Sequence, residues 1–257
     1  HYRSLFDRTI DSCGLEEPLG LLPDGALGMV LIPGGYQVTQ VRLLYAGHTY
    51  LVNENQKKLA ALSRCPGVEL AVVVPHCWRE PVLERVVPHI DPLAAFSVHP
   101  TRVIFSGNEM RYFYLSRDLL VRRFRPDFIV VENGAGAFVY TQFLLYRHLF
   151  APRAKVVFFT WWNLPYESRQ PLRALEQFNL RHSDGAIAGN HDAADIIRHH
   201  GYKGPLIVLP QLGVDEMVFA PSHDSEPRRT LGLGRFVIGY AGRLVKEKGL
   251  QVLMAAL

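Results

Sequence analysis

The chain has little cysteine and no long apolar run. Its three cysteines, Cys13, Cys65 and Cys77, include no CxxC pair, so the sequence predicts neither a disulfide framework nor a structural zinc site. His76 and Glu80 lie near Cys77 but lack further partners, and we expect no metal site. No apolar stretch approaches the roughly 20 residues of a membrane-spanning helix, and no signal peptide opens the chain. We therefore expect a cytoplasmic protein.

The chain also lacks a large excess of charge of one sign. A net charge of +4 over 257 residues is mild, and we expect no nucleic-acid partner. The basic cluster at residues 122–125 lies beside apolar residues. A solvated helix face explains this cluster. A peripheral contact with anionic lipid at the inner face of a membrane, or a contact with a phosphorylated substrate, explains it as well. The sequence makes no prediction of an oligomeric state.

Hydrophobic residues make up 48% of the chain, enough for one full core and the start of another. Residues 1–40 mix glycine, proline and isolated apolar residues without periodicity, and we expect an irregular extension there. From Val41 onward, apolar runs alternate with amphipathic segments. The expected strands are residues 41–46, 69–74, 102–105, 128–131, 155–160, 185–188 and 206–209. The expected helices lie near residues 54–63, 112–123, 137–150, 171–182 and 191–200.

This alternation predicts an α/β fold with a Rossmann-like, doubly wound parallel sheet over residues 41–210. Residues 211–235 are rich in proline, serine and charge, which is typical of an interdomain linker. Residues 236–257 are expected to begin a second Rossmann-like domain that is truncated here after one strand and one helix.

The loops that follow the strands are expected to carry the function, because ligands of a doubly wound sheet bind at the carboxyl ends of its strands. The first loop contains His48 and Asn53, the fourth contains Asn133, and the fifth contains Trp161 and Asn163. These polar and aromatic side chains are therefore candidates for one shared site.

One of these loops could be taken for a dinucleotide-binding motif. Gly134 and Gly136 follow a strand and open a helix, but Val139 stands at the place of the third glycine. Thr160 and Trp161 end the next strand, where a ribose-binding acidic residue would be needed. Because no P-loop is present either, the sequence argues against NAD and nucleoside triphosphates as ligands.

The most informative segment is residues 236–249, FVIGYAGRLVKEKG. An apolar run at residues 236–240 predicts a buried strand, which opens at Gly242 into a loop that carries Arg243 and Lys248. Glycine lets a backbone approach a ligand, and a helix N-terminus with two cations suits a diphosphate. A strand-turn-helix unit with two solvated basic side chains explains the same residues.

The loop at residues 241–249 resembles the one that begins the donor domain of retaining GT-B glycosyltransferases of family 4, the mannosyltransferase and sucrose-synthase-like group. Four further segments occur in the order expected of the N-terminal domain and linker of that family: residues 125–131, 155–163, 183–190 and 208–219. The resemblance extends from about Val41 to Leu257.

The resemblance implies transfer of a sugar from a nucleotide-diphosphate sugar to an acceptor hydroxyl, with retention at the anomeric carbon. It implies that Arg243 and Lys248 bind and neutralise the donor diphosphate without a metal or any other cofactor, and that Gly242 and Asn53 complete the donor site. The truncated second domain leads us to expect that the chain alone is inactive and binds nucleotide sugars feebly.

For the acceptor, a carbohydrate or a lipid-linked molecule, the resemblance implies a site formed by His48, Asn133, Trp161 and Asn163 within residues 41–210. An aromatic ring can form a stacking wall for a sugar, and an amide can bind its hydroxyl groups. Packing of the tryptophans in the core or at its rim is the structural alternative.

The chain departs from the family pattern at two places. Many members carry a Gly-Gly pair where this chain has residues 51–55, LVNEN, and many have a histidine where it has Trp161. Two other classes therefore stay open, an epimerase of the GT-B type that acts on sugar nucleotides and a non-catalytic module that binds a carbohydrate or a protein partner.

Overall fold

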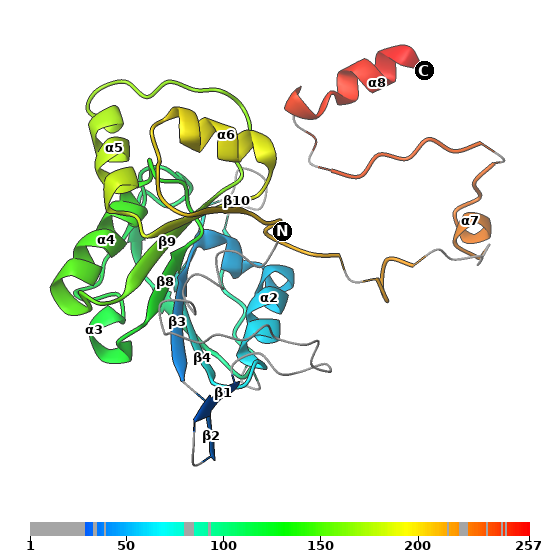
Figure 1. Cartoon of the computed structure of the whole chain (residues 1–257). Helices are drawn as coiled ribbons and strands as arrows, with labels where there is room; N and C mark the ends of the chain where they lie inside the picture. Colours follow the sequence, from blue (N-terminus) through cyan, green and yellow to red (C-terminus); the bar gives the residue numbers. More distant parts are fainter. Residues whose placement is uncertain are drawn as a thin grey trace. The chain divides into compact units, whose positions relative to one another are not determined.

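The computed structural model describes residues 29–32, 35–38, 40–79, 85–91, 94–214, 216–220, 226–234, 236–242, 244 and 246–257. The chain divides into two units, His1–Gly213 and Val214–Leu257 (Figure 1).

The first unit is built on a seven-stranded sheet with the strand order β11-β10-β9-β8-β3-β4-β5, and all its neighbouring strands are parallel. The strands are β3 (Val41–Ala46), β4 (Val68–Pro75), β5 (Ser97–Thr101), β8 (Phe128–Val131), β9 (Lys155–Thr160), β10 (Gly185–Ala188) and β11 (Leu206–Val208). The strand order reverses between β3 and β8, where the chain passes from one half of the sheet to the other. The predicted doubly wound, Rossmann-like sheet is confirmed.

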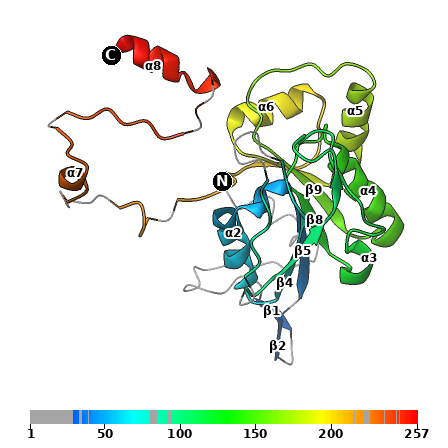
Figure 2. The ribbon, with the colours of Figure 1, turned by 180° about the vertical axis from the view of Figure 1, so that it is seen from behind.

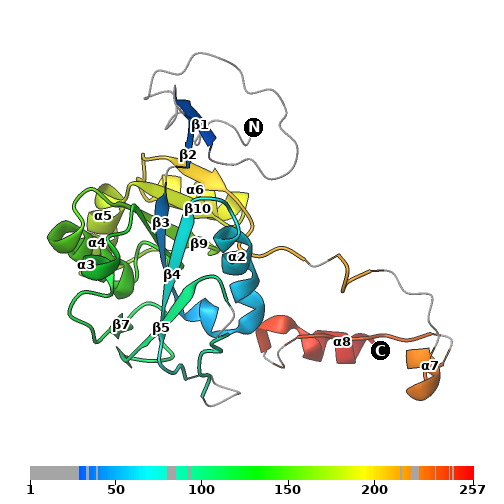
Figure 3. The same ribbon diagram turned by 90° about the horizontal axis from the view of Figure 1, so that it is seen from below.

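Helices cover both faces of this sheet because its strands are apolar on both sides. They are η1 (His48–Leu51), α2 (Asn53–Ser63), α3 (Val121–Phe124), α4 (Phe138–Phe150), α5 (Leu172–His182) and α6 (His191–His199). Figure 3 shows α4 and α5 on one side of the strands and α2 on the other. The inner stripe of α4 includes Tyr140, whose ring centroid lies 5.5 Å from that of Phe158 in β9.

Most predicted elements are confirmed. The bounds of β3, β8, β9 and β10 are as predicted, and β11 is one residue shorter. Each of these strands is a short apolar run, and the middle strands are buried on both faces. The helices α2, α4, α5 and α6 begin and end within one residue of their predictions.

The predicted third strand of the sheet, residues 102–105, is wrong. The sheet instead uses β5, and β6 (Val103–Ile104) pairs antiparallel with β7 (Phe113–Tyr114) in a separate two-stranded sheet. Proline within β5 hides its strand character, and it is tolerated because β5 is an edge strand (Figure 2). The carbonyl of Thr101 accepts from His76 N (2.7 Å) and so faces β4, which turns the backbone of Pro100 outward.

The predicted helix at residues 112–123 is also wrong, since only Val121–Phe124 is helical. Tyr112 and Tyr114 are buried and alternate with the less buried Phe113, as in a strand. Leu119 and Leu120 have φ values of 45° and 67°, which a right-handed helix cannot contain. The local apolar spacing therefore suggested a helix where the chain turns.

Within the extension that was predicted to be irregular, β1 (Met29–Ile32) and β2 (Gly35–Val38) form an antiparallel hairpin. The prediction is wrong for these residues, because short runs rich in β-branched and aromatic side chains favour strands. Residues 1–28 lie outside the described part of the chain.

The second unit contains α7 (Glu226–Thr230), η2 (Lys246–Lys248) and α8 (Leu250–Ala256). The predicted strand at residues 236–240 is absent from the described residues of this unit, and Phe236 is 84% exposed. A strand needs a neighbour for its backbone hydrogen bonds, and the described part of the unit supplies none. In the described part of the whole chain, no helix combines the length and the apolar character needed to cross a membrane.

Candidate functional site

A pocket of about 440 Å³ lies at the carboxyl ends of three central strands of the first unit. Its walls come from the loops after β3 (His48 and Thr49), after β8 (residues 132–136) and after β9 (residues 160–162). The gap between β3 and β8 is the point where the strand order reverses, and in doubly wound sheets ligands bind in this crevice. Location alone therefore makes the pocket the main candidate site.

The pocket brings together three of the four residues predicted for acceptor binding, His48, Asn133 and Trp161. Asn163 is exposed and is not among the residues that line it. Asn53, predicted for the donor site, begins α2 and is exposed outside the pocket lining.

The other predicted donor residues belong to the second unit. Gly242 precedes η2, and Lys248 ends it with an exposed side chain. Arg243 lies outside the described residues.

The imidazole of His48 is held between aromatic rings. It stacks on Trp78 with ring centroids 4.7 Å apart and meets the edge of Tyr112. Its Nε2 lies 3.4 Å from Oε1 of Glu109, which also lines the pocket. The ring is thus fixed in place, with one nitrogen turned to a carboxylate.

The floor of the pocket is the buried carboxylate of Glu132, which directly follows β8. Its Oε1 accepts from the Tyr50 hydroxyl (2.5 Å) and from Lys58 Nζ (2.5 Å), and its Oε2 accepts from Gln211 Nε2 (2.6 Å). A Cβ added at Gly47 would lie 2.8 Å from the Cβ of Glu132, so the close approach needs glycine there. The buried charge is therefore paired and hydrogen-bonded, as burial requires.

Trp161 forms one wall and is held by two neighbours. Its indole N–H donates to Oε1 of Gln211 (2.7 Å). A Cβ at Gly189 would lie only 2.2 Å from the ring, so the indole lies directly against that glycine. Trp161 remains 48% exposed and Trp162 57% exposed, so both indoles present surface to a ligand.

Asn133 lines the pocket, but its amide is engaged within the protein. Its Oδ1 accepts from the Tyr112 hydroxyl (2.7 Å), and its Nδ2 donates to the carbonyl of Glu109 (3.2 Å). Through these two hydrogen bonds, Asn133 holds the segment that carries Glu109 against the end of β8. Its side chain therefore positions the pocket wall, whether or not it also contacts a ligand.

The two phenols that contact the floor and Asn133 stay protonated. Burial, followed by the negative charge of Glu132, raises the pKa of Tyr50 well above its usual value. Burial is also the largest cause that raises the pKa of Tyr112. Both hydroxyls therefore remain hydrogen-bond donors over the physiological pH range.

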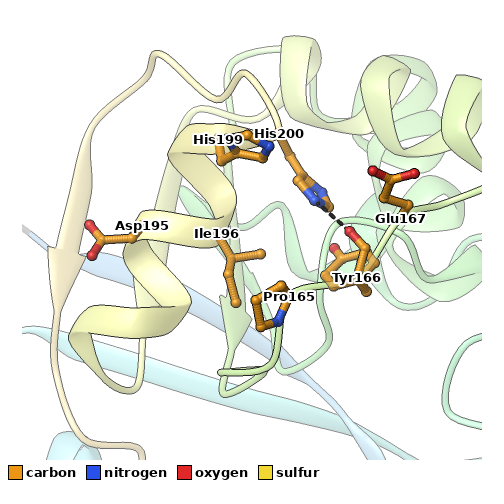
Figure 4. A pocket seen from close by; sticks show the side chains of 7 residues that line it. All are labelled: Pro165, Tyr166, Glu167, Asp195, Ile196, His199 and His200. Atoms are coloured by element: carbon orange, nitrogen blue, oxygen red, sulfur yellow. Dashed lines mark hydrogen bonds between the residues drawn. The ribbon is translucent and has the colours of Figure 1, made fainter.

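A second cavity, of about 470 Å³, is lined by residues of the loop that follows β9, by residues of α6 and by His200 at the end of that helix (Figure 4). Two of its lining residues, Tyr166 and His200, contact buried Glu176. This carboxylate accepts from the hydroxyls of Tyr166 and Ser168, at 2.5 and 3.0 Å, and lies 3.0 Å from His200 Nδ1. His200 Nε2 lies 3.1 Å from the Tyr166 carbonyl. Because Tyr166 lines both cavities, Glu176 anchors the loop that bears Trp161.

Several residues of the site were not predicted. Thr49 follows His48 and lines the pocket, but a lone threonine carries no signal in sequence. Glu132 could have been found, since an acidic residue that ends a buried strand at the switch point is unusual. Lys58 and Gln211 lie 74 and 79 positions from Glu132, and only the folded chain brings them to it.

Among the described residues, no cluster of three or more His, Cys, Asp and Glu side chains could hold a metal ion.

No protein-family model matches the sequence, and neither does any curated protein sequence. In structure, the chain is similar to sucrose-phosphate synthase (tll1590) from Thermosynechococcus elongatus, with a TM-score of 0.58 and 14% identity over 84% of this chain and 59% of that one. A UDP-N-acetylglucosamine 2-epimerase covers 66% of this chain and 48% of its own, with 13% identity and a TM-score of 0.43, which is too weak to weigh. The first likeness shows the fold, which is of the GT-B type.

Proposed function

We propose that this protein is a glycosyltransferase that moves a sugar from a nucleotide-diphosphate sugar to an acceptor hydroxyl, with retention at the anomeric carbon. The observation that carries the proposal is the pocket at the switch point between β3 and β8, which both His48 and Trp161 line. The likeness in fold to sucrose-phosphate synthase supports it. Membership of family 4 is part of the proposal, and it rests on the sequence resemblance.

The acceptor, a carbohydrate or a lipid-linked molecule, is assigned to this pocket. A concave site with aromatic walls and a few fixed polar groups is the usual form of a small-molecule site. The exposed indoles of Trp161 and Trp162 supply the walls, and His48 supplies a polar group.

The donor diphosphate is assigned to Arg243 and Lys248, with Gly242 allowing close approach of the backbone. Negative charge builds on the diphosphate as the sugar leaves, and fixed cations at that place lower the barrier. The proposed chemistry needs no metal ion or other cofactor. The chain spans 59% of the length of the synthase it resembles, so this reaction is proposed for the protein as a whole.

The test is a transfer assay on the full-length protein with a panel of nucleotide sugars and neutral and phosphorylated acceptors. NMR of the product reports the anomeric configuration, which we expect to match that of the donor. An inverted product would contradict the retaining mechanism, and no transfer with any donor would contradict the proposed activity.

The same assay separates the two other classes. An epimerase converts the donor when no acceptor is present. A binding module leaves the donor intact while a carbohydrate still binds. Trp161, at a position where many family-4 members have histidine, is the observation that keeps the binding module open.

A further inference from the structure

We propose that the β6–β7 hairpin is a docking surface for an anionic lipid membrane, in which exposed apolar side chains insert while neighbouring arginines bind lipid phosphates. This hairpin surface consists of Arg79, Arg102, Ile104, Phe105, Arg111 and Leu115. The membrane contact is independent of the proposed function. A second conclusion, that the acceptor is lipid-linked and not a free carbohydrate, rests on the proposed function.

The positive charge of the chain is concentrated around this hairpin. Residues 97–125, from the start of β5 to the C-cap of α3, contain six arginines, no lysine and two acidic residues. This excess of four positive charges equals the net charge of the whole chain, so the rest of the chain is neutral on balance. All six arginines are exposed, and the one ion pair that they make among the described residues joins Arg123 to Asp118 at 3.8 Å. The other five are therefore available to an anionic partner.

The register of the hairpin turns apolar side chains outward. Val103 pairs with Tyr114, and Ile104 pairs with Phe113. Side chains alternate along a strand, so the pair that includes buried Tyr114 faces the core and the other pair faces outward. Leu115 follows Tyr114 on the outward side and is 53% exposed.

Phe105 extends this outward apolar side. Its ring is 58% exposed, and its centroid lies 6.2 Å from that of Phe113. Its φ of 57° is unusual for a bulky residue, and such conformations occur most often at functional sites. The following loop is ordered, because Asn108 Oδ1 accepts from the N–H groups of Met110 and Arg111. The exposed phenylalanine is thus held in place by the fold.

Arginines lie next to these apolar side chains. The Leu115 N–H donates to the Arg102 carbonyl (2.7 Å), which extends the pairing by one step and places Arg102 on the outward side with Ile104. The N–H of Arg79, an exposed residue, donates to the Ser106 hydroxyl (3.1 Å), so a further cation lies beside the loop. Cations and apolar groups therefore form one mixed surface.

An anionic membrane fits both parts of this surface. Arginine binds phosphate through two N–H groups, and an anionic leaflet presents phosphates above an apolar interior. Ile104, Phe105 and Leu115 can insert at the boundary between head groups and acyl chains. An acidic protein or a nucleic acid would attract the arginines but would leave these apolar side chains without a comparable partner.

The same loop forms part of the pocket. Glu109 and Met110 line the pocket. Their carbonyls accept from Asn133 Nδ2 (3.2 Å) and from the Phe138 N–H (2.9 Å), which fixes the loop to the end of β8 and to the start of α4. A membrane that contacts the hairpin surface therefore lies close to the pocket wall, and this favours a lipid-linked acceptor.

Vesicle flotation with the 257-residue chain tests the docking without any need for turnover. Vesicles of phosphatidylcholine are compared with vesicles in which phosphatidylglycerol replaces part of it. We expect binding to the anionic vesicles alone, and release at high salt, since the screening length falls from about 10 Å at 0.1 M to about 3 Å at 1 M. Absence of binding to the anionic vesicles would overturn the proposal.

The double variant Arg102→Gln/Arg111→Gln tests the cations. One arginine near an anionic surface contributes roughly fivefold in affinity, so binding should weaken by about 25-fold. Arg153→Gln/Arg173→Gln, at two exposed arginines outside residues 97–125, changes the net charge equally and should bind far more nearly as the wild type does. Equal losses in the two double variants would show adsorption by overall charge and would overturn the hairpin surface.

Phe105→Ser tests insertion. The loss of an inserted aromatic ring should weaken vesicle binding by about tenfold. Because the ring is mostly exposed, we expect little change in the melting temperature. Leu149→Ser, at an exposed position of α4, is the control and should bind as the wild type does. Wild-type affinity in Phe105→Ser would show a purely electrostatic contact, as with an acidic protein, and would overturn membrane insertion.

The acceptor is tested separately in the full-length protein. Hexadecyl glycosides of glucose, galactose and mannose in anionic vesicles are compared with the soluble methyl glycosides. We expect transfer to a hexadecyl glycoside, reduced in Arg102→Gln/Arg111→Gln. Transfer to methyl glycosides alone would overturn the lipid-linked acceptor and leave the glycosyltransferase standing. No transfer to any acceptor would contradict the proposed function, and with it the lipid-linked acceptor, while the vesicle binding would stand.

Discussion

The amide of Gln211 joins the buried carboxylate of Glu132 to the indole of Trp161, donating to the first at 2.6 Å and accepting from the second at 2.7 Å. Gln211 lies two residues before the end of the first unit. The pocket floor, the pocket wall and the last residues of the unit are therefore connected by direct hydrogen bonds, and the following predictions probe that connection and the proposed donor loop.

Replacing Glu132 by glutamine is expected to destabilise the first unit strongly. The change leaves Lys58, which is largely buried, without its counter-charge. Breaking a buried ion pair costs about 3–5 kcal/mol. Because Lys58 is partly exposed, we expect the free energy of unfolding to fall by about 3 kcal/mol or less. Urea unfolding measures it. Glu54→Gln, which breaks the exposed pair with Lys57, is the control and should cost less than about 1 kcal/mol.

Gly47→Ala should destabilise the same floor by overpacking. The new methyl group would lie 2.8 Å from the Cβ of Glu132, so the carboxylate or the loop after β3 has to shift. Such forced shifts cost roughly 1–3 kcal/mol. Gly134→Ala is the control at the same pocket, because its methyl group would meet only Thr160 Oγ1 at an ordinary 3.7 Å. Equal unfolding midpoints for the two variants would show that the floor tolerates the methyl group.

Glu176→Gln should loosen the loop that follows β9 while the sheet stays folded. In the wild type, the two carboxylate oxygens of Glu176 accept from the hydroxyls of Tyr166 and Ser168 and contact His200. Glutamine offers a single acceptor oxygen, so at least one of these contacts is lost. We expect faster hydrogen exchange over residues 161–170 and weaker sugar binding. The matched control is Glu167→Gln, an exposed neighbour. If residues 161–170 of the Glu176→Gln variant exchange at the wild-type rate, Glu176 does not anchor this loop.

In the full-length protein, Arg243→Ala or Lys248→Ala should lower turnover by about 10²–10³-fold, the scale on which one preorganised charge stabiliser acts. Both variants should bind the acceptor sugar normally. Lys246→Ala, an exposed cation of the same loop, is the control and should stay within a few-fold of wild type. If all three variants turn over alike, the loop is a basic turn without a role in donor chemistry.

The central strands of the sheet could be predicted from the sequence, because their apolar pattern depends only on residues that are neighbours along the chain. A run such as β8 is apolar at every position, which suits burial on both faces, and Glu132 directly follows it. The carboxyl-end rule then places His48 and Trp161 at one edge without further information. These inferences need only the order of the elements along the chain.

The remaining parts depend on contacts between distant residues. Tyr112 and Tyr114 form a strand-like segment because the core receives both rings, which no local spacing reveals. The partners of Glu132 come from α2 and from the chain beyond β11, so the buried ion pair follows from the fold as a whole.

The outward-facing Pro100 has a consequence for association between copies of the chain. An exposed edge strand is a template on which a second molecule can add its own strand. At Pro100 the edge of β5 has no N–H to donate, which interrupts the hydrogen bonds that such a strand would need. The opposite edge strand, β11, is only three residues long. Both ends of the sheet are thereby protected against growth into intermolecular β-structure at high concentration.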